Sequence, residues 1–328
     1  MAPKSILSEK EGGNFFKFSF LEGLLQISQF PKLQWKAEQQ TLRDAYEEHH
    51  APLTPYAEAN SKAPRFAYQP ATNVPQTSDI IPQLSDILPF IDWRMFLLFW
   101  GFKGETLQQL LVNPEAEHTL EEGKQYLQHA IEQQTIQVQT LVHFESAKRR
   151  GNDIVLEDNT VLPMLRSQSM TGHYLCLADY FDNQLSTPLG LFTIVARPTI
   201  QPTDEADRLM SHAICARLSE ACAEWLQQTL YGQQPALRLA FGYATCPDHS
   251  LKRIVFDLLD AERQLDITLT DHYSIQPSTS ICGFFISHPE ARYFPVGRID
   301  EAQLADYCQR RGISISEGEQ LLSKYIAH

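Results

Sequence analysis

Strand-like segments follow one another in this chain without a helix between them, and this order constrains the fold most. The run DIVLEDNTVLPML at 153–165 has two β-rich halves around Asp158-Asn159, which predicts a hairpin. HYLCLADYF at 173–181 and PLGLFTIVA at 188–196 are predicted as the next strands. Directly connected strands pair antiparallel, so the sequence favours an α+β fold with an antiparallel sheet over a doubly wound parallel one.

Three long segments show helical periodicity. The segment 119–144 is predicted as an amphipathic helix that begins with a capping box of Thr119 and Glu122. The segment 205–230 is predicted as a longer helix, with one apolar stripe of residues three or four positions apart. The segment 250–265 is predicted as another amphipathic helix.

The C-terminal part is expected to combine strands with two short helices. LRLAFGY at 237–243 is a predicted strand, and STSICGFFISH at 278–288 is predicted to pair antiparallel with RYFPVGRI at 292–299. After them, Asp300 with Gln303 is expected to cap a helix from Glu301 to Arg311 that ends at Gly312. A last short helix is expected around Ser316 and Glu319.

The N-terminal part differs in character from the rest. A helix is predicted within 34–50, and residues 51–90 then carry seven prolines, which predicts an extended arm over the body. We therefore expect an N-terminal extension and Pro-rich arm at 1–85 and one domain at 86–328.

Composition excludes several classes of function. With 40 acidic and 27 basic residues the formal net charge is −13, which argues against broad nucleic-acid binding. The most apolar window, 87–102, is interrupted by Asp92 and Arg94, so no membrane span is expected. The first residues lack an apolar signal-peptide core, and the six cysteines form no CxxC pair, which together predict buried thiols in a cytoplasmic protein.

Three charged residues stand in apolar surroundings and are candidates for a binding site. Asp92, between Ile91 and Trp93, either caps the following helix or receives a cation. Glu220 lies in a row of small residues on the 205–230 helix; it either faces a ligand or is an ordinary glutamate paired with a neighbour such as Arg217. Arg238, on an apolar strand, needs an anion, and its planar fork suits a carboxylate.

The stretch RLAFGYATCPDH at 238–249 adds further candidates. Gly242 lets the chain turn or approach a ligand, and Tyr243 offers a flat face and a hydroxyl. Cys246 and His249 form a CxxH, which is a weak signal for zinc because no second tight pair exists. A Cys246 nucleophile with His249 as base is the other chemistry that this pair allows. Neither nucleotide phosphate motif, GxGxxG or GxxxxGK[ST], is present.

Taken together, several stretches resemble the S-adenosylmethionine-binding activation domain of cobalamin-dependent methionine synthase. They span about residues 90–315 and are, in order, FIDW, KRRGNDI, LCLADYF, RLSEACAEWL, RLAFGYATCPDH and SHPEARYFPVGRIDEAQLADYCQRRG. The resemblance implies a single C-shaped α+β domain, whose antiparallel sheet is flanked by helices, with a groove for S-adenosylmethionine. It also implies an electron from a flavodoxin-like donor and a methyl group from S-adenosylmethionine, which together restore methylcobalamin from cob(II)alamin.

The resemblance also implies roles for individual residues. Asp92 would receive the amino group of the methionine moiety and Arg238 its carboxylate, while Glu220 and Tyr293 would lie near the sulfonium and its methyl group. The remaining ligand contacts would come from Ala240, Gly242, Tyr243 and Phe294. No metal ligand is implied.

The cobalamin is expected to come from a partner, because the sequence contains no DxHxxG motif. We therefore expect a free-standing activator that docks on a separate cobalamin-dependent methionine synthase lacking this module, without binding nucleic acid or membrane. Two alternatives remain open at this point: a corrinoid-protein interaction module without ligand binding, and a small zinc protein built on Cys246 and His249.

Overall fold

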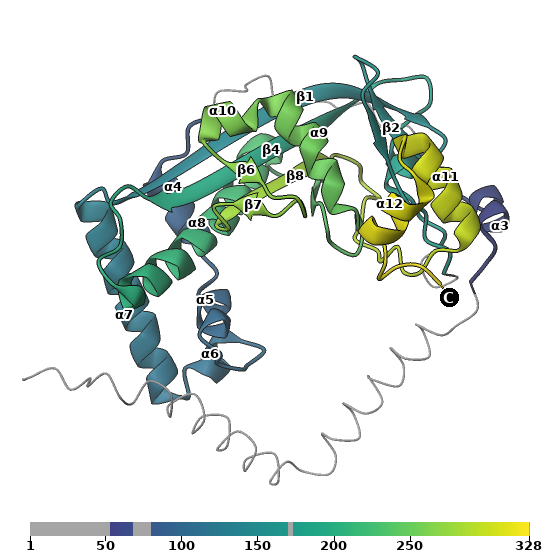
Figure 1. Cartoon of the computed structure of the whole chain (residues 1–328). Coiled ribbons are helices and arrows are strands. Elements are labelled where there is room, and N and C mark those ends of the chain that lie inside the picture. The colour runs from purple at the N-terminus through teal and green to yellow at the C-terminus, as the bar shows by residue number, and fades with distance from the viewer. Residues whose placement is uncertain (1–52, 68–79, 170–172, 328) are drawn as a thin grey trace, which may run out of the picture. The chain divides into compact units, whose positions relative to one another are not determined.

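The centre of the fold is a six-stranded antiparallel sheet that curls into a half-barrel. The computed structural model describes residues 53–67, 80–169 and 173–327. Its strand order is β3-β2-β1-β4-β8-β5, so β5 is an edge strand. Figure 1 shows β1, β4 and β8 running side by side in this sheet. The strand bounds are β1 Ile136–Arg150, β2 Asp153–Leu156, β3 Val161–Pro163, β4 Thr187–Pro198, β5 Leu237–Ala240 and β8 Ser280–Ile286, and a separate two-stranded ribbon joins β6 Thr268–Leu269 to β7 Ile275–Gln276. The predicted α+β class with an antiparallel sheet is confirmed.

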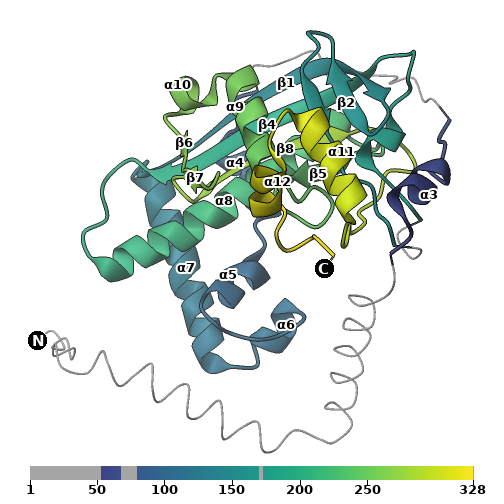
Figure 2. The same cartoon turned by 45° about the vertical axis from the view of Figure 1, so that its right-hand side comes forward.

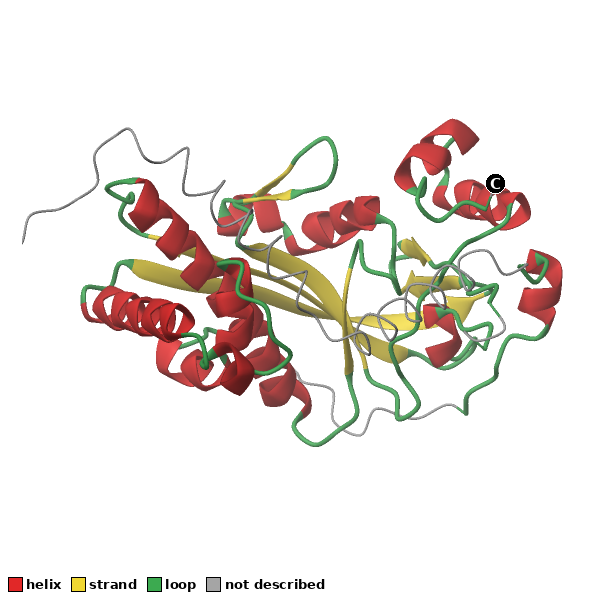
Figure 3. Ribbon diagram, turned by 90° about the horizontal axis from the view of Figure 1, so that it is seen from below, coloured by secondary structure: helices red, strands yellow, loops and turns green. Residues whose placement is uncertain are grey.

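Helices cover both faces of this sheet (Figures 2 and 3). One core cluster joins β1 and β4 to α4 Leu84–Ile87, α5 Trp93–Phe99, α6 Leu107–Leu110, α7 Pro114–Glu132 and α8 Glu205–Tyr231. The other joins the opposite face to α9 Lys252–Leu259, α10 Ala261–Leu265 and α11 Glu301–Arg311, with α12 Ile315–Leu321 packed against α11. Alternate residues of β4 supply the two clusters, Leu191 to one and Phe192 to the other, as a strand with two covered faces requires.

The helix predicted at 119–144 is partly wrong. The helix α7 begins after Asn113, whose Oδ1 accepts a hydrogen bond from the backbone N–H of Glu115, and Thr119 lies inside it instead of capping it. The chain leaves the helix at Gln134, which has φ of 53°, and Ile136 begins the longest strand of the sheet. The β-branched and aromatic residues after Thr135 pair with β4 along twelve positions, and this pairing overrides the helical pattern of the apolar residues.

Two predicted strands are also wrong. Residues Leu177–Tyr180 form a 3-10 turn, in which the buried carboxylate of Asp179 accepts from the backbone N–H of Cys176 and forms ion pairs with Arg166 and Arg149. The segment 292–299 is not a sheet strand, because β8 already has β4 and β5 as its two neighbours.

The predicted hairpin at 153–165 and the predicted long helix are confirmed. Asn159 turns the hairpin with φ of 69°. Helix α8 matches the predicted range within a residue. The predicted helix at 250–265 is divided into α9 and α10 at Asp260, which has φ of 48°.

The predicted cap of α11 is confirmed. Asp300 accepts from Gln303 N at 2.8 Å and Gly312 ends the helix with φ of 73°. The short helix expected around Ser316 and Glu319 is present as α12, and its N-cap is Ser314.

The segment 53–67 contains helix α3 Tyr56–Ser61 and packs against distant parts of the chain. Tyr56 donates from its backbone N–H to Asp300 at 2.9 Å and from its hydroxyl to Asp306 at 2.7 Å. Phe66 stacks on Tyr180 with ring centroids 5.0 Å apart. The helix predicted within 34–50 lies outside the described residues, as do residues 51–52 and 68–79 of the proline-rich stretch. The described rest of that stretch is only partly extended, because it contains α3, α4 and the 3-10 turn Leu88–Phe90. The boundary at residue 85 stays a prediction.

Candidate functional site

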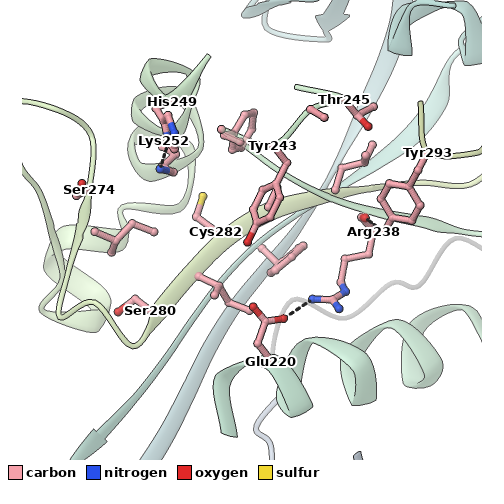
Figure 4. Close-up of a pocket in the computed structure, with 18 of the residues that line it drawn as sticks. Glu220, Arg238, Tyr243, Thr245, His249, Lys252, Ser274, Ser280, Cys282 and Tyr293 are labelled. Carbon is pink, nitrogen blue, oxygen red and sulfur yellow. Dashed lines mark hydrogen bonds and ion pairs between the residues drawn. The ribbon is translucent and has the colours of Figure 1, made fainter. Parts of the chain in front are cut away.

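A pocket of about 810 Å³ lies at the edge strand β5 and the turn that follows it. Its walls come from β5, the 242–246 turn, helix α8, the start of α9, the β7–β8 region and the segment 293–295. Seven of the eight sequence-predicted ligand residues line it: Glu220, Arg238, Ala240, Gly242, Tyr243, Tyr293 and Phe294. Residues more than 70 positions apart in the sequence are therefore gathered around one cavity (Figure 4).

The period of the strand explains why Arg238 faces this pocket. Leu237 and Leu239 are buried in the core, so the alternate residues Arg238 and Ala240 point to the other side of β5. The Arg238 guanidinium lies 3.1 Å from Glu220 and 3.5 Å from Glu224, both on helix α8. Glu220 is therefore paired with Arg238 and not with Arg217. Glu224 is more exposed and does not line the pocket, but it brings a second carboxylate to the guanidinium.

The turn after β5 is built around Gly242. Its backbone has φ of 90°, a region that L-residues with side chains rarely adopt. A Cβ on Gly242 would lie 1.9 Å from Cε1 of His249, so the histidine ring occupies the space that any side chain would need. Gly242 N donates to Cys246 O at 2.7 Å, which closes the turn and leaves the Tyr243 side chain 66% exposed at the pocket.

The segment 293–296 is bonded to this turn and to β5. Thr245 donates from its hydroxyl to the Phe294 carbonyl at 2.7 Å, and Val296 N donates to Ala244 O at 2.8 Å. The Tyr293 hydroxyl donates to the backbone carbonyl of Arg238. Burial raises the pKa of Tyr293, so the phenol remains a proton donor well above neutral pH.

The structure adds two pocket residues that the sequence reasoning did not assign as ligand contacts, His249 and Lys252. Lys252 is 8% exposed, and its Nζ lies 2.8 Å from Nδ1 of His249 and 2.9 Å from the carbonyl oxygen of Tyr273, to which it donates. Burial lowers the pKa of the Lys252 ammonium; burial and then the charge of Lys252 lower the pKa of His249. Their spacing of three at a helix start brings both side chains to one side, a signal that could have found the pair.

The Cys246–His249 spacing does not assemble a metal site among the residues that the structure describes. No cluster there has three or more His, Cys, Asp or Glu side chains in reach of one ion. Cys246 is 3% exposed, and burial raises the pKa of its thiol, while Nδ1 of His249 is engaged by Lys252. A protonated buried thiol is a poor nucleophile, so the pair is not arranged for covalent catalysis.

Asp92 is the one predicted ligand residue that does not line the pocket. It is exposed and caps helix α5, with Oδ1 accepting from the backbone N–H of Met95 at 3.1 Å. The sequence left capping and cation binding open for this residue, and the structure shows the cap.

Across the described ranges, no helix combines the length and the apolar character that a bilayer span requires.

The fold is shared with a known structure. A crystal structure of the MetH reactivation domain bound to AdoHcy superposes with a TM-score of 0.74, at 24% sequence identity, over 85% of this chain and 100% of that one. The family model for the vitamin B12 dependent methionine synthase activation domain matches residues 83–236 and 230–312, most of the chain. The protein therefore belongs to the vitamin B12-dependent methionine synthase activation domain family.

Proposed function

We propose that this chain binds S-adenosylmethionine in the Arg238 pocket and supports reductive remethylation of the cobalamin of a methionine synthase. In that reaction one electron from a flavodoxin-like donor and the methyl group of S-adenosylmethionine convert cob(II)alamin to methylcobalamin, and S-adenosylhomocysteine is released. The cobalamin would be carried by a synthase module outside these 328 residues, since the sequence has no DxHxxG motif.

The observation that carries the proposal is the ionic end of the pocket. S-adenosylmethionine has one carboxylate, one ammonium and one sulfonium, so it needs one cationic partner and more than one anionic or aromatic partner. Arg238 with Glu220 and Glu224 supplies that set within 3.5 Å. The ligand carboxylate would take guanidinium N–H groups of Arg238, and the ligand cations would compensate the two glutamates.

The aromatic residues fit the reacting end of such a ligand. Tyr243 and Tyr293 are each 66% exposed and both line the pocket, so their ring faces are available to a sulfonium. We assign Glu220 and Tyr293 to the methyl end, and Ala240, Gly242, Tyr243 and Phe294 to the walls. The role of Asp92 toward the ligand amino group stays a prediction, because its carboxylate caps α5 here.

Calorimetry with S-adenosylmethionine tests ligand binding. We expect saturable binding to the full chain, and at least a tenfold loss of affinity in Arg238→Ala, because an Arg–carboxylate pair is removed. Arg208→Ala is the matched control, since Arg208 is exposed on α8 and pairs with Glu205 at 2.9 Å, away from the residues that line the pocket. Absence of binding at millimolar ligand, alone and with a cobalamin-loaded synthase, would contradict the proposal.

The second candidate function is a corrinoid-protein interaction module without ligand binding. It is favoured by one observation: Arg238 has protein partners for its charge without any ligand. Pull-down with a cobalamin-loaded synthase separates the two functions. If Arg238→Ala retains both docking and activation, the interaction module is correct and ligand binding at this pocket is not needed.

A further inference from the structure

Three aromatic rings from distant parts of the chain pack together in what we call the ring cluster. Phe66 stacks on Tyr180 with ring centroids 5.0 Å apart and planes inclined by 18°, and the His288 ring lies 5.5 Å from each of them. Tyr180 and His288 are only 3% and 4% exposed. Phe66 belongs to the segment 53–67, before the first residue that the family model matches, residue 83. It therefore covers two rings of the domain from outside the matched region.

His288 joins this segment to the turn that follows β8. Its Nε2 lies 3.3 Å from the carbonyl oxygen of Ala67, and its Nδ1 lies 3.1 Å from the backbone nitrogen of Glu290. Because a backbone N–H only donates, Nδ1 is the acceptor, and the proton of the neutral ring lies on Nε2, which donates to Ala67. Both ring nitrogens of a buried histidine thus hold the turn against the segment 53–67.

Tyr180 holds the other end of the same turn, 288–292. Its hydroxyl accepts a hydrogen bond from the backbone N–H of Arg292 at 3.3 Å. The turn is therefore held at both ends by the two rings on which Phe66 packs. The next residue along the chain is Tyr293, which lines the pocket. A displacement of the turn would consequently be passed directly to a pocket residue.

Tyr293 depends on its neighbours for its position, because its side chain is 66% exposed. Its hydroxyl donates to the carbonyl oxygen of Arg238, and Figure 4 shows its ring beside that residue. After it, the carbonyl oxygen of Phe294 accepts from the Thr245 hydroxyl at 2.7 Å. The backbone of Tyr293 is thus anchored on one side by the turn after β5 and on the other side by the ring cluster.

We propose that Phe66 is a positioning residue for the ligand pocket, which fixes Tyr293 through the ring cluster. Phe66 does not line the pocket itself, so it acts only through the turn 288–292. The inference rests on the proposed function, in which Tyr293 contacts the methyl end of the ligand. It makes the segment 53–67 part of the binding machinery, although the family model does not include it.

The state of the Tyr293 hydroxyl tests this role without any ligand. In a chain whose tyrosines are isotopically labelled at the ζ carbon, the NMR signal of Tyr293 is identified by its loss in Tyr293→Phe. We expect Phe66→Ala to shift or broaden this signal, because the hydroxyl then exchanges between the Arg238 carbonyl and water. Phe102→Ala is the matched control and should leave the signal unchanged, since Phe102 is a partly buried phenylalanine of the other core cluster that does not line the pocket.

An unchanged Tyr293 signal in folded Phe66→Ala would overturn the inference. If Phe66→Ala does not fold, Phe66→Leu, which keeps apolar volume without a flat ring, takes its place.

Ligand affinity gives the second test. By calorimetry, Phe66→Ala should bind S-adenosylmethionine about 3- to 10-fold more weakly, as expected when one neutral hydrogen bond at the pocket is no longer held. Phe66→Tyr keeps the ring and should bind like the wild type. Because Phe66 acts through Tyr293, the double variant Phe66→Ala/Tyr293→Ala should bind no more weakly than Tyr293→Ala alone. Losses that multiply would show an independent effect and would contradict the inference.

The outcomes separate this inference from the function on which it rests. If the wild-type chain binds no S-adenosylmethionine, alone or with a cobalamin-loaded synthase, the proposed function fails and the inference with it. If the wild-type chain binds and folded Phe66→Ala binds equally well, only the role of Phe66 is overturned.

Discussion

The guanidinium of Arg238 lies 3.1 Å from the carboxylate of Glu220, across the gap between the edge strand β5 and helix α8. This pair links the two elements at the pocket, and the more exposed Glu224 beside it gives the cluster of three side chains one negative charge in excess. The excess charge favours a ligand with a net positive end over a neutral one. Several testable consequences depend on this arrangement and on the turn beside it.

Glu220→Gln should reduce discrimination between S-adenosylmethionine and S-adenosylhomocysteine. The first has a sulfonium and the second a neutral thioether, so removing the carboxylate charge weakens binding of the first more. We expect the ratio of the two affinities to fall about tenfold, measured by calorimetry at low salt. An unchanged ratio would show that Glu220 does not face the sulfonium.

Gly242→Ala should both destabilise the protein and abolish ligand binding. The residue has φ of 90°. A Cβ added to it would lie 1.9 Å from Cε1 of His249, so the His249 ring would have to move. We expect a loss of about 2 kcal/mol or more in the free energy of unfolding, measured by urea titration. Gly312→Ala is the control: it has φ of 73° but nothing within 4 Å of a Cβ, so it should lose about 1–2 kcal/mol and keep its affinity.

His249 should make the protein less stable in mild acid. Burial and Lys252 lower its pKa in the folded state below the ordinary value, so the unfolded chain binds more protons as the pH falls. The free energy of unfolding therefore carries no penalty from His249 above about pH 6.5, and it decreases as the pH falls from there through the folded-state pKa. An NMR titration of the His249 ring checks the direction, and Lys252→Met should raise that pKa; a pKa above the ordinary value in the wild type would refute this.

Tyr56→Phe should loosen the segment 53–67. The hydroxyl donates to Asp306 at 2.7 Å and accepts from Asn152 at 2.8 Å, so its removal takes one hydrogen bond from each of them. We expect a loss of about 1–2 kcal/mol in the free energy of unfolding and faster proteolysis near the N-terminal segment. Tyr243→Phe, at an exposed ring of the pocket, should leave stability unchanged; equal effects in both would contradict the account.

The pocket thiol Cys282 should resist alkylation in the native state. It is 3% exposed, and burial raises its pKa to about 12, so almost no thiolate is present at pH 8. Mass spectrometry after iodoacetamide treatment should find Cys282 modified only after unfolding. Rapid modification of the native protein would contradict the buried position of Cys282 in the pocket wall.

Local signals predicted those parts of the fold that depend on local interactions. The cap at Asp300 and the glycine at Gly312 mark the ends of α11 because capping uses neighbouring backbone groups. The strand from Ile136 could not be predicted in the same way, because apolar residues at helical spacing continue past Thr135. The strand conformation of this segment is determined by its pairing with β4, about fifty residues later in the chain.

The site residues also differ in how far the sequence could predict them. Arg238 and Gly242 were found because a lone cation on an apolar strand and a glycine at its end are conspicuous in the sequence. Glu220 stood out in its row of small residues, but its role and that of Tyr293 were assigned through the family resemblance; both line the pocket with Arg238. Lys252 was missed because its charge is matched by a carbonyl and a histidine, which only the folded turn brings near.

Reactivation tests the central claim most directly. A cobalamin-dependent methionine synthase without its own activation domain, oxidised to cob(II)alamin, is incubated with this protein, S-adenosylmethionine and a reduced flavodoxin. We predict return of methylcobalamin, seen in the visible spectrum, and transfer of label from methyl-labelled S-adenosylmethionine, both strongly reduced with Arg238→Ala and intact with Arg208→Ala. A synthase that stays in the cob(II)alamin state, or that recovers equally with Arg238→Ala, would contradict the account.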